Sequence, residues 1–250
     1  MSEMERIQGI VHDIQVVDRG SIKYMRFGSD GGWQGALDTA HPLRPVFPYQ
    51  RAFAALLPAF RRNPLQFLAI GVGTGTCLRT VDAQFPESEL WGVELDEVVL
   101  ETAMYRFDAP SHRRATYFVG DGLEFLQQTQ DKFSLIFVDA YMSNRIYAPM
   151  LKTTVPDLIA DVLLPGGVAC FNLITTVPPT DKIAAWATAA KEFFPEIYFL
   201  PVGVPYSEQN VLAIFSLETL PLQRLSQLLR TNTTLTLWER LSWPFRLVSY

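Results

Sequence analysis

A glycine-rich turn is the feature of this sequence with the clearest potential to hold a ligand. Gly71, Gly73 and Gly75 follow an apolar run over residues 66–70 and precede a helical pattern. Glycines there let the backbone turn sharply and approach a ligand closely, while the helix N-terminus offers free N–H groups. Thr76 follows Gly75, so no third glycine completes the GxGxxG pattern of dinucleotide sites. This weakens the case for a nicotinamide cofactor, and a turn that serves packing alone is the alternative.

Acidic residues follow the next three apolar runs of the chain. Glu94 ends the run that comes about twenty residues after the turn, where doubly wound folds place a carboxylate against ribose hydroxyls. Asp121 lies between two glycines, the second being Gly122, so an adenine amino group can approach its carboxylate closely. Asp139 follows the fourth run. Capping a helix is the alternative role for Asp96, which lies two residues after Glu94, and a turn before a helix is the alternative for Asp121.

The elements that would position these residues alternate between strand and helix. Short runs rich in Val, Ile, Leu and Phe predict strands over residues 66–70, 89–93, 115–119, 134–138 and 168–173. Two further runs, 197–202 and 210–217, predict a terminal antiparallel pair because a short turn joins them. We therefore expect an α/β fold with a doubly wound, mostly parallel, seven-stranded Rossmann-like sheet. Ligands of such sheets bind outside the carboxyl ends of the strands, where the glycine turn and the acids converge.

The N-terminal part is predicted to be a small β-rich extension. Residues 14–17 and 22–27 flank a turn signal and predict a β-hairpin, and a helix is expected over about 49–60. The expected division is an extension over residues 1–48 and a Rossmann-like domain over residues 49–250. The tail from Pro221 predicts one amphipathic helix.

Composition excludes several classes of protein. With 48% hydrophobic and 19% charged residues, the chain is a compact globule rather than a disordered one. A net charge of -5 without clustered Lys and Arg argues against nucleic-acid binding. The absence of an apolar run of about 18 residues and of a signal peptide pattern predicts a cytoplasmic protein without a membrane partner. The spacing of the two cysteines and three histidines suggests no metal site.

Taken together, these motifs resemble the spermidine synthase-like (polyamine aminopropyltransferase) family, which shares the class I S-adenosylmethionine-dependent methyltransferase fold. The resemblance runs from about Ile14 to Asn172 and lies in the order and spacing of the motifs. These are the hairpin, Gln34, Tyr49-Gln50, the turn at residues 71–75, Val93-Glu94-Leu95-Asp96, Gly120-Asp121-Gly122, Val138-Asp139 and Leu164-Pro165-Gly166-Gly167.

The resemblance implies a donor, an acceptor and roles for the site residues. The donor is S-adenosylmethionine or its decarboxylated form, with its ribose on Glu94, its adenine on Asp121 and its sulfonium chain at the glycine turn. Gln34 and Tyr49 would lie at the nucleoside and amine pockets. The acceptor would be a small molecule such as an amine, and a homodimer through the N-terminal strands is plausible by the same resemblance.

The amine half of the family pattern is altered. The family base is the second acid of an Asp-x-x-Asp motif, which here reads Asp139-Ala140-Tyr141-Met142, and methionine cannot accept a proton. Asp139 and Tyr49 are therefore the remaining catalytic candidates. The acids that flank the family tyrosine are missing, and Arg51 adds a positive charge that would repel a polyamine. Tyr141 and Asn144 either line the acceptor pocket or belong to an ordinary loop.

Three functions are consistent with this pattern. The first is a spermidine synthase-like transferase that moves an alkyl or aminopropyl group from an adenosylsulfonium donor to a small acceptor. The second is an S-adenosylmethionine-dependent methyltransferase acting on a small molecule, because methyl transfer to a good nucleophile needs little acid or base help. The third is a non-catalytic nucleoside-binding homologue.

Overall fold

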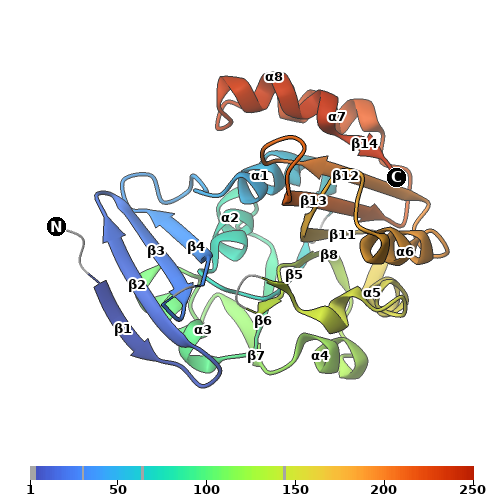
Figure 1. The fold of residues 1–250 in the computed structure, drawn as a ribbon. Helices are drawn as coiled ribbons and strands as arrows, with labels where there is room; N and C mark the ends of the chain where they lie inside the picture. The colour runs from blue at the N-terminus through green and yellow to red at the C-terminus, as the bar shows by residue number, and fades with distance from the viewer. Residues whose placement is uncertain (1–3, 30, 63–64, 143–144) are drawn as a thin grey trace.

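A central eight-stranded sheet dominates the structure, a computed structural model that describes residues 4–29, 31–62, 65–142 and 145–250 (Figure 1). In spatial order its strands are β14 (Val248–Ser249), β12 (Glu196–Pro201), β13 (Gln209–Ser216), β11 (Leu163–Thr175), β8 (Phe133–Val138), β5 (Gln66–Ile70), β6 (Glu89–Glu94) and β7 (Ala115–Val119). The five strands from β11 to β7 are parallel, and β13 pairs antiparallel with β11 and β12. The predicted mostly parallel α/β sheet and its terminal antiparallel pair are confirmed, with the two-residue β14 as an additional strand.

Both faces of this sheet are covered, because side chains alternate along each strand. In β5, Phe67 and Ala69 join one hydrophobic cluster and Leu68 and Ile70 join the other. The first cluster includes residues of α1 (Pro48–Phe60), α2 (Thr76–Gln84), α3 (Glu97–Arg106), α7 (Leu222–Thr231) and α8 (Leu237–Arg246). The second includes residues of α4 (Gly122–Gln128), α5 (Val155–Val162) and α6 (Asp181–Ala190). The sheet is therefore doubly wound, as expected.

The N-terminal segment forms a four-stranded antiparallel sheet in the order β1 (Met4–Gln8), β2 (Asp13–Arg19), β3 (Ile22–Phe27) and β4 (Trp33–Asp38). The predicted hairpin is the β2–β3 pair, and the sequence interpretation missed β1 and β4. Ile14 and Met25 of this sheet pack with Val99 and Phe107 from the region of α3, beside which the sheet lies in Figure 1. This packing brings β4 close to the glycine-rich turn.

The C-terminal tail contains two helices, α7 and α8, where the sequence predicted one. A turn at residues 233–235 separates them, and α8 begins with a capping box between Thr236 and Glu239. Figure 1 shows both helices on the same side of the sheet as α1, against which α7 packs. Among the described residues, no helix is long and apolar enough to cross a membrane.

The described part of the chain between β8 and α5 forms only short elements. Tyr141–Met142 and Arg145–Ile146 form the two-residue strands β9 and β10, which precede a short 3-10 helix, η1 (Ala148–Leu151). Tyr141, Tyr147 and Met150, which follow β8 in the chain, line one cavity. Asn144, a candidate for the acceptor pocket, lies outside the described residues, as does the side chain of Met142.

Candidate active site

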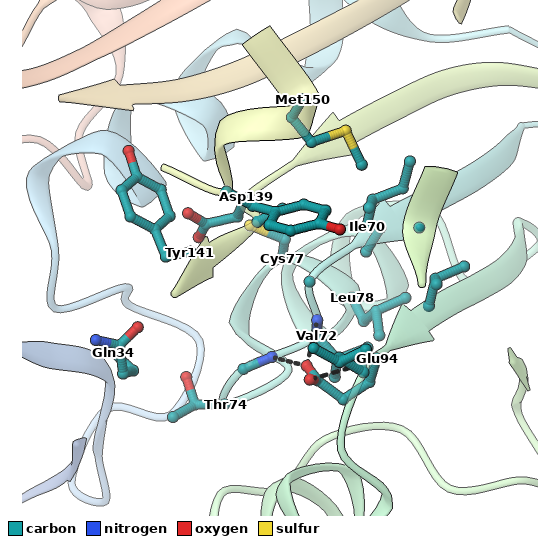
Figure 2. A pocket seen from close by; sticks show the side chains of 18 of the residues that line it. Gln34, Ile70, Val72, Thr74, Cys77, Leu78, Glu94, Asp139, Tyr141 and Met150 are labelled. Atoms are coloured by element: carbon teal, nitrogen blue, oxygen red, sulfur yellow. Dashed lines mark hydrogen bonds between the residues drawn. The ribbon is translucent and has the colours of Figure 1, made fainter. Parts of the chain in front are cut away.

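A cavity with an empty volume of about 910 Å³ lies at the carboxyl ends of β5, β6, β7 and β8 (Figure 2). Part of this volume is open to solvent. The predicted site residues that line it are Gln34, Gly71, Gly73, Glu94, Asp121, Gly122 and Asp139. Glu94 and Asp121 come from different strands, and both face this one cavity. The convergence expected from parallel strand ends is therefore present.

Two glycines of the turn have different surroundings. Gly71 has φ +85°, and a Cβ atom on it would lie 2.4 Å from the backbone oxygen of Asp139. Only glycine allows the turn to approach the end of β8 this closely. Gly75 is the N-cap of α2 with φ +67°, and a Cβ atom there would lie 2.3 Å from the Cβ of Ala109. Gly75 is not among the residues that line the cavity, and it allows α2 to pack closely against the residue 109 loop.

Glu94 holds the glycine turn in place. Its Oε2 accepts hydrogen bonds from the backbone N–H groups of Val72 at 3.0 Å and Gly73 at 3.1 Å, drawn as dashed lines in Figure 2. Its Oε1 accepts from the N–H of Leu95 at 2.9 Å. Burial raises the pKa of Glu94, and these backbone donors partly offset that rise. The N–H of Asp96 also donates to Oε1, at 3.3 Å, so each oxygen already accepts two hydrogen bonds and a ligand hydroxyl would share an oxygen with a backbone N–H.

Asp121 is both a helix cap and a wall of the cavity. Its Oδ1 accepts from the N–H groups of Leu123 at 2.6 Å and Glu124 at 3.3 Å, which caps α4. Its Oδ2 accepts from the hydroxyl of Tyr147 at 2.7 Å. The cap that the sequence offered as an alternative role is therefore present, and it does not remove Asp121 from the cavity. Asp96 caps α3 through the N–H of Val98 at 2.9 Å and is not a lining residue.

Asp139 is held by two side-chain donors. Its Oδ2 accepts from the hydroxyl of Tyr49 at 2.7 Å, and its Oδ1 accepts from the Nδ2 of Asn172 at 2.7 Å. Burial raises the pKa of Asp139 to about 6, against the lowering effect of these two donors. Burial and the charge of Asp139 raise the pKa of Tyr49, so that the phenol stays protonated and donates. The acid is therefore ionised at neutral pH and held in one orientation.

A second cavity, with an empty volume of about 860 Å³, lies on the other side of Asp139. Gln34, Asp139 and Tyr141 line both cavities, so the two are neighbours. The remaining walls of the second cavity are Gly32, Trp33, Phe47, Pro48, Tyr49, Asn172, Ile174 and Asn210. The sequence left two roles open for Tyr141, a wall of the acceptor pocket or an ordinary loop residue, and Tyr141 lines both cavities. A carboxylate thus lies at the junction between the first cavity and one with four aromatic wall residues.

Arg51 does not line either cavity, contrary to the expectation that it would repel a polyamine there. Its Nε donates to Oε1 of Glu239 in α8 at 2.9 Å, and its Nη1 donates to the backbone oxygen of Val46. The side chains of Arg51 and Glu239 are both largely buried. The arginine thus neutralises a buried acid and ties α1 to α8. The sequence could not reveal this pairing because the partners are 188 residues apart.

Several wall residues of the cavities were not singled out from the sequence. Tyr147 lines the first cavity, as does Gln50, a motif residue that had no assigned role and that donates to the Tyr49 hydroxyl at 3.2 Å. Asn172 and Asn210 line the second, and the Nδ2 of Asn210 donates to the Oδ1 of Asn172 at 2.9 Å. The amides lie within β11 and β13, where polar residues interrupt apolar strands. A buried asparagine in such a strand is the one signal that could have identified them. No group of three or more His, Cys, Asp or Glu in the described residues is arranged to hold a metal ion.

The spermine/spermidine synthase domain family matches residues 46–226, which is most of the chain. This range contains the wall residues of both cavities except for those in β3, in β4 and between these strands. The chain belongs to the spermine/spermidine synthase family. It is 34% identical over 125 residues to a probable polyamine aminopropyl transferase of Bifidobacterium longum, covering 50% of this chain and 27% of that protein. It is 25% identical over 169 residues to the spermidine synthase of Dictyostelium discoideum, covering 65% and 58%.

Solved structures of the family have the same fold. A probable spermidine synthase from Corynebacterium glutamicum superimposes with a TM-score of 0.80 at 16% identity, covering 92% of this chain and 88% of that one. The chain spans 27% and 58% of the two curated relatives above. The resemblance to the family that the sequence suggested is therefore confirmed.

Proposed function

We propose that this protein is a transferase that moves an alkyl group from an adenosylsulfonium donor to a small acceptor amine. The first candidate for this group is aminopropyl. The observation that carries the proposal is the position of Asp139, whose carboxylate lies between the two cavities. A transfer reaction needs two reactants to meet at one point, and positioning of this kind supplies much of the acceleration. The names of the curated relatives support the same class of reaction.

The first cavity is assigned to the donor. Glu94 would accept from the ribose hydroxyls, and Asp121, with Tyr147 beside it, would accept from the adenine amino group. Gly71, Gly73 and Gln34 would lie along the sulfonium chain. Asp121 keeps a lone pair on Oδ2 for a ligand, whereas a ribose hydroxyl at Glu94 would share an oxygen with a backbone N–H. The preferred donor is decarboxylated S-adenosylmethionine, since the described walls of the junction carry an acid and no arginine or lysine that would bind a donor carboxylate.

The second cavity is assigned to the acceptor, and Asp139 to the reaction itself. The nitrogen of a neutral primary amine attacks the carbon next to sulfonium, the carbon–sulfur bond breaks, and its electron pair stays on sulfur to give a thioether. The proton lost by nitrogen passes to Asp139, which is ionised above pH 6. Tyr49 and Asn172 hold the two oxygens of this acid. Such a base contributes about 10²–10⁴-fold to the rate.

Calorimetry with methylthioadenosine tests the donor half, and mass spectrometry of the products from decarboxylated S-adenosylmethionine plus an amine tests the transfer. We expect saturable nucleoside binding and an amine product heavier by one aminopropyl group. Nucleoside binding without any transfer would contradict the proposal and favour the non-catalytic homologue. No binding of any adenosyl nucleoside would contradict both.

Methyl transfer from S-adenosylmethionine is the second candidate. The observation that favours it is the single carboxylate among the described walls of the second cavity, because methyl transfer to a good nucleophile needs less base catalysis. Competition between the two donors discriminates. Preference for the carboxylate-bearing donor, together with a product heavier by one methyl group, would replace aminopropyl transfer with methyl transfer.

A further inference from the structure

We propose that the acceptor is a primary monoamine with an aromatic or apolar body, and not a diamine with a second charged end. This inference rests on the proposed transfer function and specifies the substrate class of the second cavity. The observations that carry it are the charges and the side chains around that cavity. Together they determine which groups surround the end of the acceptor that is remote from the reacting nitrogen.

The described walls of the second cavity contain one acid, Asp139, and it already serves the reacting nitrogen. A diamine would bring a second ammonium group, which stays protonated at neutral pH because the pKa of an alkylamine is about 10. An ammonium group removed from water without a carboxylate partner is strongly disfavoured. In the sequence, Met142 occupies the position where the family motif supplies its second acid. The cavity therefore provides for one amine.

Positive charge lies against one wall of the cavity. The guanidinium carbons of Arg19 and Arg26 lie 5.1 and 5.4 Å from the ring centroid of Trp33, within cation–π range. Arg26 is fixed there because its Nε and Nη2 both donate to the side chain of Gln15. Two cations behind the Trp33 wall repel a distal ammonium and do not affect an uncharged group.

Four aromatic residues contribute to the wall of the second cavity. Trp33, Phe47, Tyr49 and Tyr141 all line the cavity, and Tyr49 lies 6.2 Å from Phe47 between ring centroids. Aromatic walls gain most from a flat or apolar ligand, which they bury with offset or edge contacts. The Nδ2 of Asn210 donates to the Oδ1 of Asn172, so the amide oxygens of the two side chains are the remaining acceptors here, and neither carries a charge. An arylalkyl amine fits these walls better than a charged chain.

Glu208 is the acid that could restore a diamine site. It precedes β13 on an exposed loop and is not a wall residue of the cavity. Its charge nonetheless reaches Tyr141, whose pKa is raised by burial first, then by Asp139 and Glu208. Glu208 thus lies outside the aromatic wall, where it is solvated. Its substitution is a direct test of whether it takes part in acceptor binding.

The experiment compares three amines with decarboxylated S-adenosylmethionine as donor: 1,4-diaminobutane, butylamine and 2-phenylethylamine. We expect kcat/KM to be at least about 10-fold higher for 2-phenylethylamine than for 1,4-diaminobutane, with butylamine between them. Phe47→Ala should raise KM for 2-phenylethylamine by about 10-fold and leave methylthioadenosine binding unchanged. Glu208→Gln should change the rate with none of the three amines.

Failure of this inference is distinguishable from failure of the proposed function. A higher kcat/KM for 1,4-diaminobutane, or a loss of its turnover in Glu208→Gln, would overturn the monoamine assignment while transfer itself stands. If no amine is alkylated, the proposed function fails. The same three amines are then titrated calorimetrically into the methylthioadenosine complex, where tighter binding of 2-phenylethylamine supports the assigned acceptor class and tighter binding of the diamine overturns it.

Discussion

The two cavities of this protein differ in how far apart in the sequence their walls lie. The first is built mainly from residues at the ends of successive parallel strands, each inside a short motif. The second collects residues from β4, the start of α1, the end of β8, and the strands β11 and β13. Strand ends converge by topology alone, whereas the second cavity exists only because the N-terminal sheet and α1 pack across the sheet edge. The first cavity thus follows from local motifs, and the second from tertiary packing.

Asp139→Asn should break the connection between the cavities most severely. Loss of the carboxylate removes the proton acceptor, so transfer should fall by about 10²–10⁴-fold, while methylthioadenosine affinity changes by less than about threefold. Steady-state rates and calorimetry measure the two effects. Asp157→Asn, on the exposed face of α5, is the matched control and should behave as wild type. Equal losses of rate and nucleoside affinity would show that Asp139 belongs to the donor site alone.

The pH dependence of stability should report the same acid. Because burial raises the pKa of Asp139 from 3.8 to about 6, the folded state holds its proton over a pH range where the unfolded state has lost it. This contribution to stability is complete below pH 3.8 and is lost as pH rises through 6. It amounts to at most about 3 kcal/mol, since one pKa unit corresponds to about 1.4 kcal/mol and the group is partly solvated.

Urea unfolding between pH 4 and 7 measures this effect. Wild type should lose stability relative to Asp139→Asn over that interval, and transfer activity should rise through the same range as the base ionises. Glu94, whose pKa is also raised, contributes a slope of the same sign to both proteins and cancels in the comparison. Parallel stability curves would be inconsistent with a raised pKa at Asp139.

Glu94→Gln should weaken the first cavity and spare the second. The amide loses the charge-assisted bonds to the turn and, as proposed, to ribose, so the Kd for methylthioadenosine should rise about 10- to 100-fold. Calorimetry measures this Kd, with Glu101→Gln on the exposed side of α3 as control. The KM for the amine should stay within about twofold at saturating donor, because the substitution removes no contact to the acceptor. An unchanged Kd would remove Glu94 from the donor site.

Met142→Asp should have the smallest effect, and one on the acceptor rather than on the donor. A carboxylate at the family's acidic position should raise the rate of transfer to 1,4-diaminobutane by about fivefold, which corresponds to the free energy of a partly solvated ion pair. Nucleoside affinity should not change. Met142→Asn, which lacks the charge, is the control and should give no gain. A large loss of nucleoside affinity in the aspartate variant would contradict the separation of the two cavities.

The central sheet was predictable because its signals are local. Strands β5 and β7 have the bounds expected from their apolar runs. The glycine or acid at the carboxyl end of each strand from β5 to β8 lies at the last strand residue or within two residues of it. The N-terminal strands β1 and β4 were missed, since their alternation is weak and their stability comes from neighbouring strands. The break between α7 and α8 was missed because the apolar periodicity continues on both sides of a turn.

By itself, the sequence determined the fold class, the family and the acids around the first cavity, since apolar periodicity, glycine spacing and strand-end polarity act over a few residues. Only the tertiary structure decided that Gly75 packs against Ala109, that Arg51 pairs with Glu239, and that Tyr49 and Asn172 orient Asp139. Each of these is a contact between residues separated by tens to hundreds of positions. Side-chain direction and burial, which set charge and hydrogen bonding at the site, follow from packing and leave no local pattern in the chain.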